Sequence, residues 1–475
     1  MRAEPQAAPY TPDTPIASLA PWLAAPVEPA AFPATELRFR NRRWDKAVGL
    51  DQLSDAEWVR HFARFEPLPG NLPGPLALKY HGHQFRVYNP ELGDGRGFLF
   101  AQLRDAGPPQ AGPQSGGRLL DLGTKGSGIT PYSRTADGRL TLKGAVREIL
   151  ATEMLEALGV NTSKTFSVIE TGEDLFRQDE PSPARSAVLV RLSHGHIRIG
   201  TFQRLAYLQE RDHMVALVDY CLAQFPGPPP PADAPGRDEP AVILLHQVVE
   251  RLATLAAQWM VAGFVHGVLN TDNMNVSGES FDYGPWRWLP AWDPAFTAAY
   301  FDHSGLYAFG RQPEALHWNC GQLAIALRQL AEAPPLVAAL ERFGPLYQAA
   351  LARQFLWRLG LASQGFDTDF ALIGAAEREM RETGMAPDTF FHRHRFGANA
   401  ATGAFGDQLK TFAPTGDAHP FWADQRPPSL IIETVEAIWS AIDQHDDWSP
   451  LTAMVDQIRL LGAALGPPAD SGYEG

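Results

Sequence analysis

The chain has 475 residues and a formal net charge of −14. This length exceeds the usual size of one hydrophobic core, so we expect two lobes or domains. A surface this acidic repels phosphate backbones, which argues against general nucleic-acid binding.

The N-terminal segment, residues 1–40, is rich in Ala and Pro. Its prolines interrupt any continuous apolar run, so we expect no secretory signal and predict an arm that lies on the surface. Further Pro- and Gly-rich stretches at 104–117 and 226–240 predict loops, because such runs join neither a helix nor a central strand.

The first half of the chain predicts mainly strands. Residues 98–103 form one predicted strand, which follows the Gly-rich turn at 93–97, and residues 119–125 form another. Apolar residues from Leu142 to Leu158 recur at helical spacing and predict a helix that stops at Gly159.

A predicted hairpin comes next, with strands at 187–192 and 197–202. The loop at 193–196 contains two histidines, His194 and His196, which we expect to be turn residues without a metal role. In this register Arg191 faces Arg198, and like charges opposite one another destabilise a strand pair. A bound anion between them would remove this penalty and would have two fork-shaped phosphate donors. The alternative is that both arginines point into water.

From Ala241 onward the pattern is mainly helical. The most apolar stretch, 252–269, contains Gln258 and His266, so it predicts a buried helix rather than a membrane span. Strands followed by helices predict an α+β protein with a cleft between two lobes. The two cysteines, Cys221 and Cys320, form no Cys-x-x-Cys pair, which indicates a reducing compartment such as the cytoplasm.

The segment 266–284, HGVLNTDNMNVSGESFDYG, carries the clearest chemical signal. It places Asp272, Asn273 and Asp282 in one short polar stretch. Carboxylate and amide oxygens suit a hard cation such as Mg²⁺, which also bridges nucleotide phosphates. The alternative is a surface loop with Asx turns, since Asn and Asp are common turn residues.

The same segment follows the protein-kinase pattern H-R-D-L-x-x-x-N and then D-F-G. His266 and Asn273 keep their places, and the D-F-G position is occupied by residues 282–284. Val268 stands where kinases have the catalytic Asp, and valine cannot accept a proton. The nearest replacement carboxylate is Asp272.

Two upstream features agree with nucleotide binding. Lys125 ends a predicted strand and Glu148 lies on the helix that follows, an arrangement by which kinases hold Lys against phosphates. The turn at 93–97 lets backbone N–H groups approach phosphate oxygens, with Arg96 adding charge. Taken singly, each feature is also compatible with an ordinary surface turn or strand end.

Taken together, these segments resemble the selenoprotein O family. The matching stretches include GHQF at 82–85, LGDGR at 92–96, GTKGSG at 123–128, VRLSHGHIRIGTF, HGVLNTDNMN and DYGPW. The similarity runs in order over residues 76–320. Three departures are Arg86 after GHQF, Thr135-Ala136 before Asp137, and the absence of any Cys after Cys320, which removes the C-terminal redox residue of many relatives.

The resemblance implies a bilobal protein-kinase-like pseudokinase fold that binds ATP in a flipped orientation and transfers AMP to protein hydroxyl groups. It implies that Lys125 and Glu148 form an ion pair and that Asp272 accepts the proton. Metal ligation, by Mg²⁺ or alternatively Mn²⁺, falls to Asn273 and Asp282. The implied nucleotide site consists of Gly93, Gly95, Arg96, Asp137, Gly138, Arg191 and Arg198, the last two on the terminal phosphates.

We therefore predict a cytoplasmic protein adenylyltransferase that uses ATP and Mg²⁺, acts on Ser, Thr or Tyr of protein substrates, and binds neither nucleic acid nor membrane. After the 1–40 arm, the predicted N-lobe spans 41–204. The predicted helical C-lobe, 205–475, contains the catalytic loop 266–275, the DYG at 282–284 and a C-terminal extension. A γ-phosphotransferase and a non-catalytic ATP-binding scaffold are the alternatives.

Overall fold

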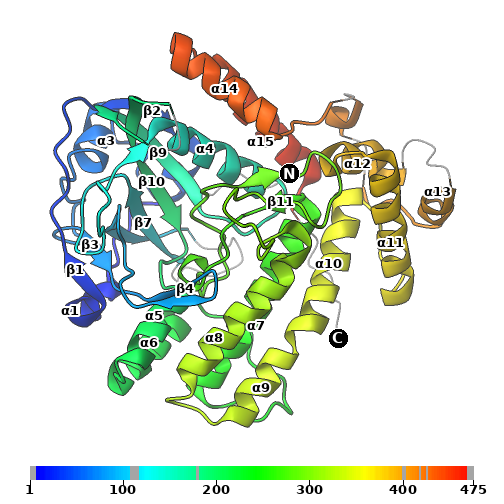
Figure 1. Cartoon of the computed structure of the whole chain (residues 1–475), viewed down its shortest axis with the longest axis horizontal. Helices are drawn as coiled ribbons and strands as arrows, with labels where there is room; N and C mark the ends of the chain where they lie inside the picture. The colour runs from blue at the N-terminus through cyan, green and yellow to red at the C-terminus, as the bar shows by residue number, and fades with distance from the viewer. Residues whose placement is uncertain are drawn as a thin grey trace.

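A computed structural model describes residues 7–106, 117–177, 181–397, 403–416, 419–423 and 426–467. It is an α+β structure in which a sheet occupies one part of the molecule and helices most of the other (Figure 1). Most of the predicted loop at 104–117 lies outside the described residues. The predicted loop at 226–240 has no regular helix or strand as far as Glu239, and the next helix begins at Pro240.

The main sheet is antiparallel and has the order β1-β3-β6-β7-β10-β9-β2, with the short β8 (Leu140–Thr141) paired to β10. The predicted strands at 98–103 and 119–125 are confirmed within one residue as β6 and β7. The bounds are β1 Ala24–Pro26, β2 Glu36–Arg40, β3 Leu76–Leu78, β6 Leu99–Arg104, β7 Leu119–Lys125, β9 Lys164–Leu175 and β10 Ala184–Ser193.

Helix α4 (Leu142–Ala157) packs on one face of this sheet, and its predicted end at Gly159 is confirmed. The Thr141 side chain accepts from the Gly144 N–H and caps its first turn. In the paired strands β7 and β10, Leu122 faces Leu192 while Gly123 faces Arg191. Because side chains alternate between faces, the leucines enter one apolar core and Arg191 lies on the face toward α4.

The expectation of a surface arm at residues 1–40 is wrong for its described part. This segment contributes β1 to one edge of the sheet, through pairing with β3, and β2 to the other edge, through pairing with β9. Between them the chain crosses the sheet, and the Ala30 N–H donates to the Ser127 carbonyl on the way. The arm also contains α1 (Ala20–Leu23) and the buried residues Ile16 and Phe32.

The predicted hairpin at 187–202 is also wrong in its second half. β10 is already paired to β7 and to β9, so neither side of it is free for another strand. The chain instead turns at Gly195, where φ is +90°, and begins helix α5 (Ile199–Tyr207). Arg191 and Arg198 are therefore not cross-strand neighbours, although both reach the same cavity.

The second half is helical, as expected, around the buried helix α7 (Pro240–Ala262). This helix ends at Gly263, earlier than the apolar stretch 252–269 suggested, and β11 (Phe264–Val265) follows and pairs with β12 (Arg287–Trp288). The other helices here are α6 Arg211–Gln224, α8 Gln312–Leu327, α9 Ala333–Glu341, α10 Phe343–Leu359, α11 Phe366–Thr383, α12 Pro387–His394 and α13 Gly403–Leu409.

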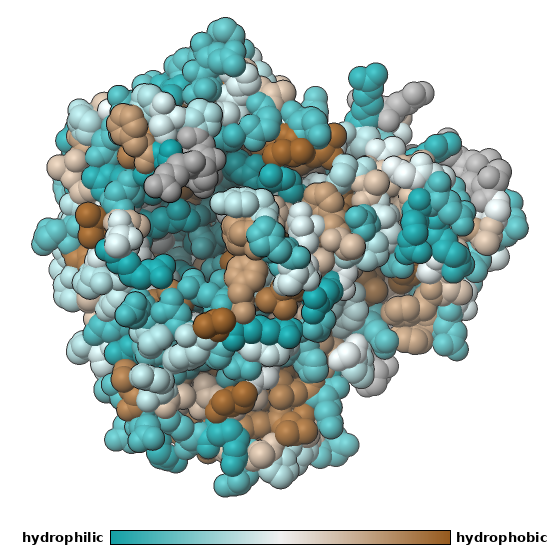
Figure 2. Space-filling model, viewed as in Figure 1, coloured by the Kyte–Doolittle hydropathy of each residue, from teal (hydrophilic) through white to brown (hydrophobic). Residues whose placement is uncertain are grey.

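Among the described residues, α7 is the one helix whose length and composition would suffice to cross a membrane, and most of its apolar surface is buried by neighbouring helices. The face of the molecule in Figure 2 is mainly hydrophilic, with its apolar residues in separate patches. The position of α7 is that of a core helix, as the sequence predicted.

The C-terminal helices α14 (Ile432–His445) and α15 (Ser449–Leu465) lie beside α4 (Figure 1). Arg459 of α15 forms an ion pair with the buried Glu153 of α4 at 2.7 Å. The C-terminal part thus supports the outer side of the helix that carries Glu148. Two short helices lie between β2 and β3, namely α2 (Arg42–Ala47) and α3 (Asp55–Phe62).

Candidate active site

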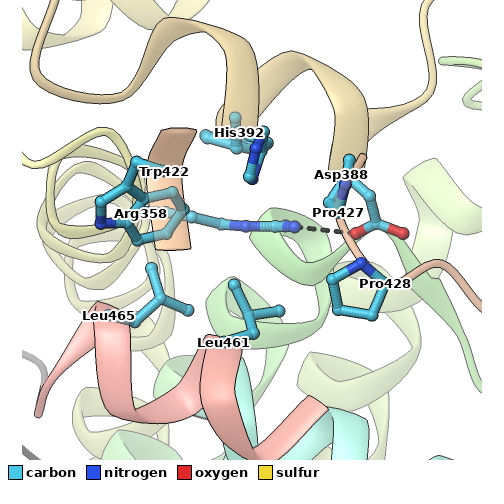
Figure 3. A pocket seen from close by; sticks show the side chains of 9 residues that line it. Arg358, Asp388, His392, Trp422, Pro427, Pro428, Leu461 and Leu465 are labelled. Atoms are coloured by element: carbon cyan, nitrogen blue, oxygen red, sulfur yellow. Dashed lines mark hydrogen bonds and ion pairs between the residues drawn. The ribbon is translucent and has the colours of Figure 1, made fainter. Parts of the chain in front are cut away.

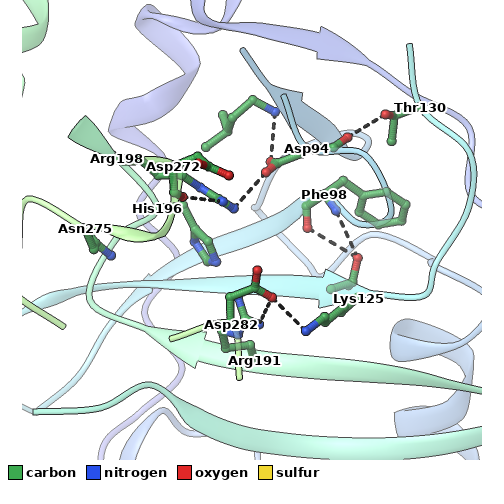
Figure 4. Close-up of polar contacts among 12 residues, drawn as sticks. Asp94, Phe98, Lys125, Thr130, Arg191, His196, Arg198, Asp272, Asn275 and Asp282 are labelled. Carbon is green, nitrogen blue, oxygen red and sulfur yellow. Dashed lines mark hydrogen bonds and ion pairs between the residues drawn. The ribbon is translucent and has the colours of Figure 1, made fainter. Parts of the chain in front are cut away.

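A cavity of about 360 Å³ lies between the sheet and the segment 266–284. Its size falls within the range of small-molecule sites. It brings together most of the residues that the sequence singled out, although they are far apart in the chain (Figure 4). The predicted residues that line it are Gly93, Gly95, Arg96, Lys125, Arg191, Arg198, Asp272 and Asp282.

Lys125 is the centre of a buried charge cluster at the end of β7. Its Nζ lies 2.5 Å from Glu148 Oε1 on α4 and 2.7 Å from Asp282 Oδ1. Burial opposes ionisation of Asp282, but Lys125, together with Arg191 and Arg96, outweighs it and holds the pKa of this carboxyl well below its ordinary value. Asp282 is therefore a permanent anion at neutral pH.

The two arginines enter the cavity from different elements. Arg191 projects from β10, with Nη2 3.5 Å from both Glu148 Oε1 and Asp282 Oδ1. Arg198 precedes α5 and lies 3.0 Å from Asp94 Oδ1, while it also donates to the Asp272 carbonyl oxygen at 2.9 Å. Both guanidinium groups are almost fully buried and have unpartnered Nε atoms, so they retain capacity to bind an anion.

Asp272 differs from Asp282 in its electrostatic setting. Burial is the main influence and raises the pKa of Asp272 to about 6, although Arg198 opposes the shift. Its Oδ1 is buried and has no hydrogen-bond partner. A carboxylate that is poorly solvated and titrates near neutrality is suited to accept a proton.

The loop that carries Asp272 is fixed from both sides. His266, buried behind it, contacts the Phe281 carbonyl oxygen at 3.0 Å through Nε2. The hairpin of β4 (Gly82–Gln84) and β5 (Val87–Asn89) covers its other side, where the Phe85 N–H donates to Asn270 Oδ1 at 3.0 Å. The His83 N–H likewise donates to Thr271 Oγ1. The position of Asp272 thus depends on two distant segments.

Gly82 provides a direct test of this dependence. A Cβ on Gly82 would lie 2.9 Å from Asp272 Oδ1, closer than real Cβ contacts, and 3.1 Å from Asp272 Cβ, which is tighter than most of them. We expect Gly82→Ala to displace the carboxylate and slow catalysis by about 10²-fold, the effect of a misplacement near 1 Å. ATP affinity, measured by calorimetry, should change less than twofold. A Gly74→Ala control, where no atom lies within 4 Å of the new Cβ, should behave as wild type.

The two predicted metal ligands, Asn273 and Asp282, both carry side-chain oxygen atoms. The Nδ2 group of Asn273 donates to the Val268 carbonyl at 3.1 Å, which leaves the amide oxygen as the end of the side chain suited to a cation. Asp282 supplies an anionic oxygen nearby in the chain. No cluster of three or more His, Cys, Asp or Glu side chains that could hold a metal occurs in the described part of the chain. An amide oxygen and a carboxylate are donor types that suit Mg²⁺, which often completes its coordination with phosphate oxygens and water.

Four predicted residues are not part of the cavity lining, namely Glu148, Asn273, Asp137 and Gly138. Glu148 lies behind Lys125, and Asn273 directly follows Asp272 in the chain. Asp137 forms an ion pair with Arg177 at 2.7 Å. Gly138, with φ of +68°, packs so closely on the Gly128 carbonyl that a Cβ would lie 2.2 Å from its oxygen. The role of Asp137 and Gly138 at the nucleotide stays a prediction. Arg86, the departure after GHQF, has φ of +65°, a conformation that favours the glycine usual in the family.

Sequence reasoning missed two polar side chains at the site. Asp94 was noted only as part of a Gly-rich turn, yet its carboxylate pairs with Arg198. His196 was expected to be a turn residue, but it lines the cavity and lies 3.0 Å from Asp121. The alternation of β7 places Asp121 on the same face as Lys125, which was the available signal for its participation.

A second cavity, of about 10 Å³, lies near the C-terminal helices (Figure 3). It has room for about one water molecule, so it is not a nucleotide site. Arg358 crosses it to reach Asp388, with an N–O distance of 2.8 Å. This buried pair joins α10 to α12.

Comparisons with known proteins give a consistent result. Residues 7–403 match the family described as Protein adenylyltransferase SelO. A protein of Synechococcus elongatus named Protein nucleotidyltransferase YdiU is 41% identical over 96% of this chain and 95% of its own. Proteins with the same name from a Synechocystis species and from Vibrio cholerae are 40% and 36% identical, over 91% and 74% of this chain and 94% and 68% of theirs.

Proposed function

The chain belongs to the protein adenylyltransferase SelO family, and from this premise we propose that it transfers AMP from ATP to Ser, Thr or Tyr hydroxyls of proteins and releases pyrophosphate. The observation that carries the proposal is the content of the cavity. Lys125, Arg191 and Arg198 surround it with positive charge, and Asp272 is a lining carboxylate with a pKa near neutrality.

In the proposed reaction, the hydroxyl oxygen of the substrate attacks the α-phosphorus of ATP. Asp272 takes the hydroxyl proton as the new P–O bond forms. The bond between the α-phosphorus and the bridging oxygen breaks, and its electron pair leaves with pyrophosphate. Lys125, Arg191 and Arg198 stabilise the negative charge that develops on this leaving group.

Asn273 and Asp282 would hold Mg²⁺, or alternatively Mn²⁺, which would neutralise phosphate charge when bound. Glu148 keeps Lys125 in position through their 2.5 Å contact. Gly93, Gly95 and Arg96 contribute to the phosphate end of the cavity.

We further propose a bilobal kinase-like arrangement, with an N-lobe that ends near 204 and includes β1 and β2 from the first 40 residues, and a C-lobe from 205. The cavity between the sheet and the 266–284 segment supports it, as does the Lys125–Glu148 pair. The free, buried cysteines Cys221 and Cys320 agree with a cytoplasmic enzyme.

The direct test is to supply ATP labelled at either the α- or the γ-phosphate together with candidate protein substrates. The proposal expects α-label on protein, a mass increase equal to AMP, and free pyrophosphate. Bound γ-label with release of ADP would show a kinase instead. Tight ATP binding without label on any protein would support a scaffold.

The arginine pair gives a separate prediction about affinity. AMP lacks the terminal phosphates, so Arg191→Ala or Arg198→Ala should weaken ATP binding by about 10- to 100-fold, the value of a hydrogen bond to a charged group. AMP binding should change little. Calorimetry with both nucleotides measures the ratio of ATP affinity to AMP affinity. Arg64→Ala, at an exposed site, serves as the control. An unchanged ratio in Arg191→Ala would exclude this role for Arg191.

A further inference from the structure

His196 has no role in the reaction as described, yet it occupies a central place in the cavity. In Figure 4 its imidazole lies between the Arg198 guanidinium and the Asp282–Arg191 pair. The ring lies over Gly123, where a Cβ would come within 2.5 Å of Nε2. The missing side chain on β7 is therefore what admits the imidazole to the phosphate end of the site.

A buried carboxylate stands behind the ring. Asp121 Oδ2 lies 3.0 Å from His196 Nδ1, and Asp121 Oδ1 accepts from Gln102 Nε2 at 2.7 Å. Gln102 is itself fixed by a 3.2 Å contact with the Tyr220 hydroxyl. Ser193 Oγ is 3.4 Å from both ring nitrogens, near the limit of a hydrogen bond. The orientation of the imidazole is thus set by Asp121.

This geometry has a consequence for the other nitrogen. Because Asp121 accepts from Nδ1–H, a proton on Nε2 makes the ring an imidazolium whose charge Asp121 balances. An imidazolium in this cavity is a compact donor to phosphate oxygen. We propose that His196, held by Asp121, is a further ligand of the terminal phosphates of ATP. The inference rests on the proposed function.

The charged groups around the ring support this assignment. Positive groups face it from β7, β10 and the start of α5, so a bound polyphosphate would find donors on several sides. Negative groups come from β7 and from the 266–284 segment. The charged residues of the cavity lining and around the ring are Asp94, Arg96, Asp121, Lys125, Arg134, Arg191, Arg198, Asp272, Glu279 and Asp282.

The experiment compares the full chain with His196→Gln and Asp121→Asn. Calorimetry with ATP, AMP and inorganic tripolyphosphate isolates the contribution of the terminal phosphates. We expect both variants to bind ATP and tripolyphosphate about tenfold more weakly, with AMP affinity changed less than twofold.

His194→Gln is the matched control. His194 belongs to the same short segment, but its ring packs on Phe225 at 5.2 Å and does not line the cavity. It should keep the wild-type preference for ATP over AMP and the wild-type affinity for tripolyphosphate. Thermal melting of each variant confirms folding, and if His196→Gln fails to fold, Asp121→Asn carries the same test.

The possible results distinguish the role of His196 from the proposed AMP transfer. If the wild-type protein transfers AMP and both variants keep its preference for ATP over AMP, the role of His196 alone is overturned. A wild-type protein that binds no ATP would overturn that role together with the proposed function. An equal loss for ATP and AMP would reduce His196 to a packing residue and also contradict the inference.

Discussion

Asp282→Asn is expected to reduce AMP transfer by about 10³-fold or more, since a metal clamp contributes several kcal/mol of transition-state stabilisation. Asn is the better substitution because Asp282 has φ of +60°, a conformation that Asn adopts more readily than Ala does. The variant keeps the shape of the side chain and removes its charge. The Mg²⁺ dependence of ATP affinity should also weaken, which calorimetry with and without a chelator measures.

The control for this prediction is Asp293→Asn, at an exposed carboxylate in the same half of the chain. It should retain full transfer. Lys125 keeps its partner Glu148 in the Asp282 variant, so the thermal melting temperature should fall only modestly. Wild-type transfer by Asp282→Asn would refute the metal assignment.

The second large effect is expected at Asp272. Asp272→Asn should slow transfer by about 10²–10⁴-fold, the usual contribution of a positioned base. The link from Arg198 to this loop uses the backbone oxygen of Asp272, so it survives the substitution. ATP affinity should therefore stay within about twofold of wild type, and single-turnover assays at saturating ATP isolate the lost step.

The same residue predicts a pH profile. Its pKa of about 6 is raised mainly by burial, so the carboxyl is protonated and inactive as a base below that value. The single-turnover rate should rise with pH through about 6 and then level off. The Asp272→Asn variant should lose this limb, and a wild-type rate that is flat from pH 5 to 7 would contradict the assignment.

Local patterns in the sequence predicted local elements well. The sequence predicted β7 and α4 because the apolar residues of each segment recur at a regular spacing. β7 ends at Lys125, and Gly159 follows the end of α4. Apolar and polar residues alternate in 197–202 as they do in a strand. The chain nevertheless enters α5 at Ile199, because both sides of β10 are already paired, with β7 and with β9. Occupancy of a strand edge depends on segments far away in the chain, which a local pattern does not contain.

In the site, too, the sequence predicted residues that belong to one motif but not the partners that distant segments supply. Residues within one motif, such as Asp272 and Asn273, are recognisable because their spacing is fixed by the loop that carries them. The partners supplied from elsewhere, Asp94 for Arg198 and Asp121 for His196, depend on the packing of the sheet against that loop. A carboxylate in a glycine turn or inside an apolar strand gives no sign of its partner before the fold is known.

The crossing of the sheet by the first residues has a consequence during synthesis. β1 and β2 leave the ribosome before their partners β3 and β9, so each stays unpaired until its partner has been made and the two strands have paired. Until then, the backbone groups of β3 and β9 are open to other chains, and such open edges promote aggregation. A chain shortened to residues 41–475 would keep every proposed catalytic group and still present these two edges. Its principal defect would be self-association rather than lost chemistry.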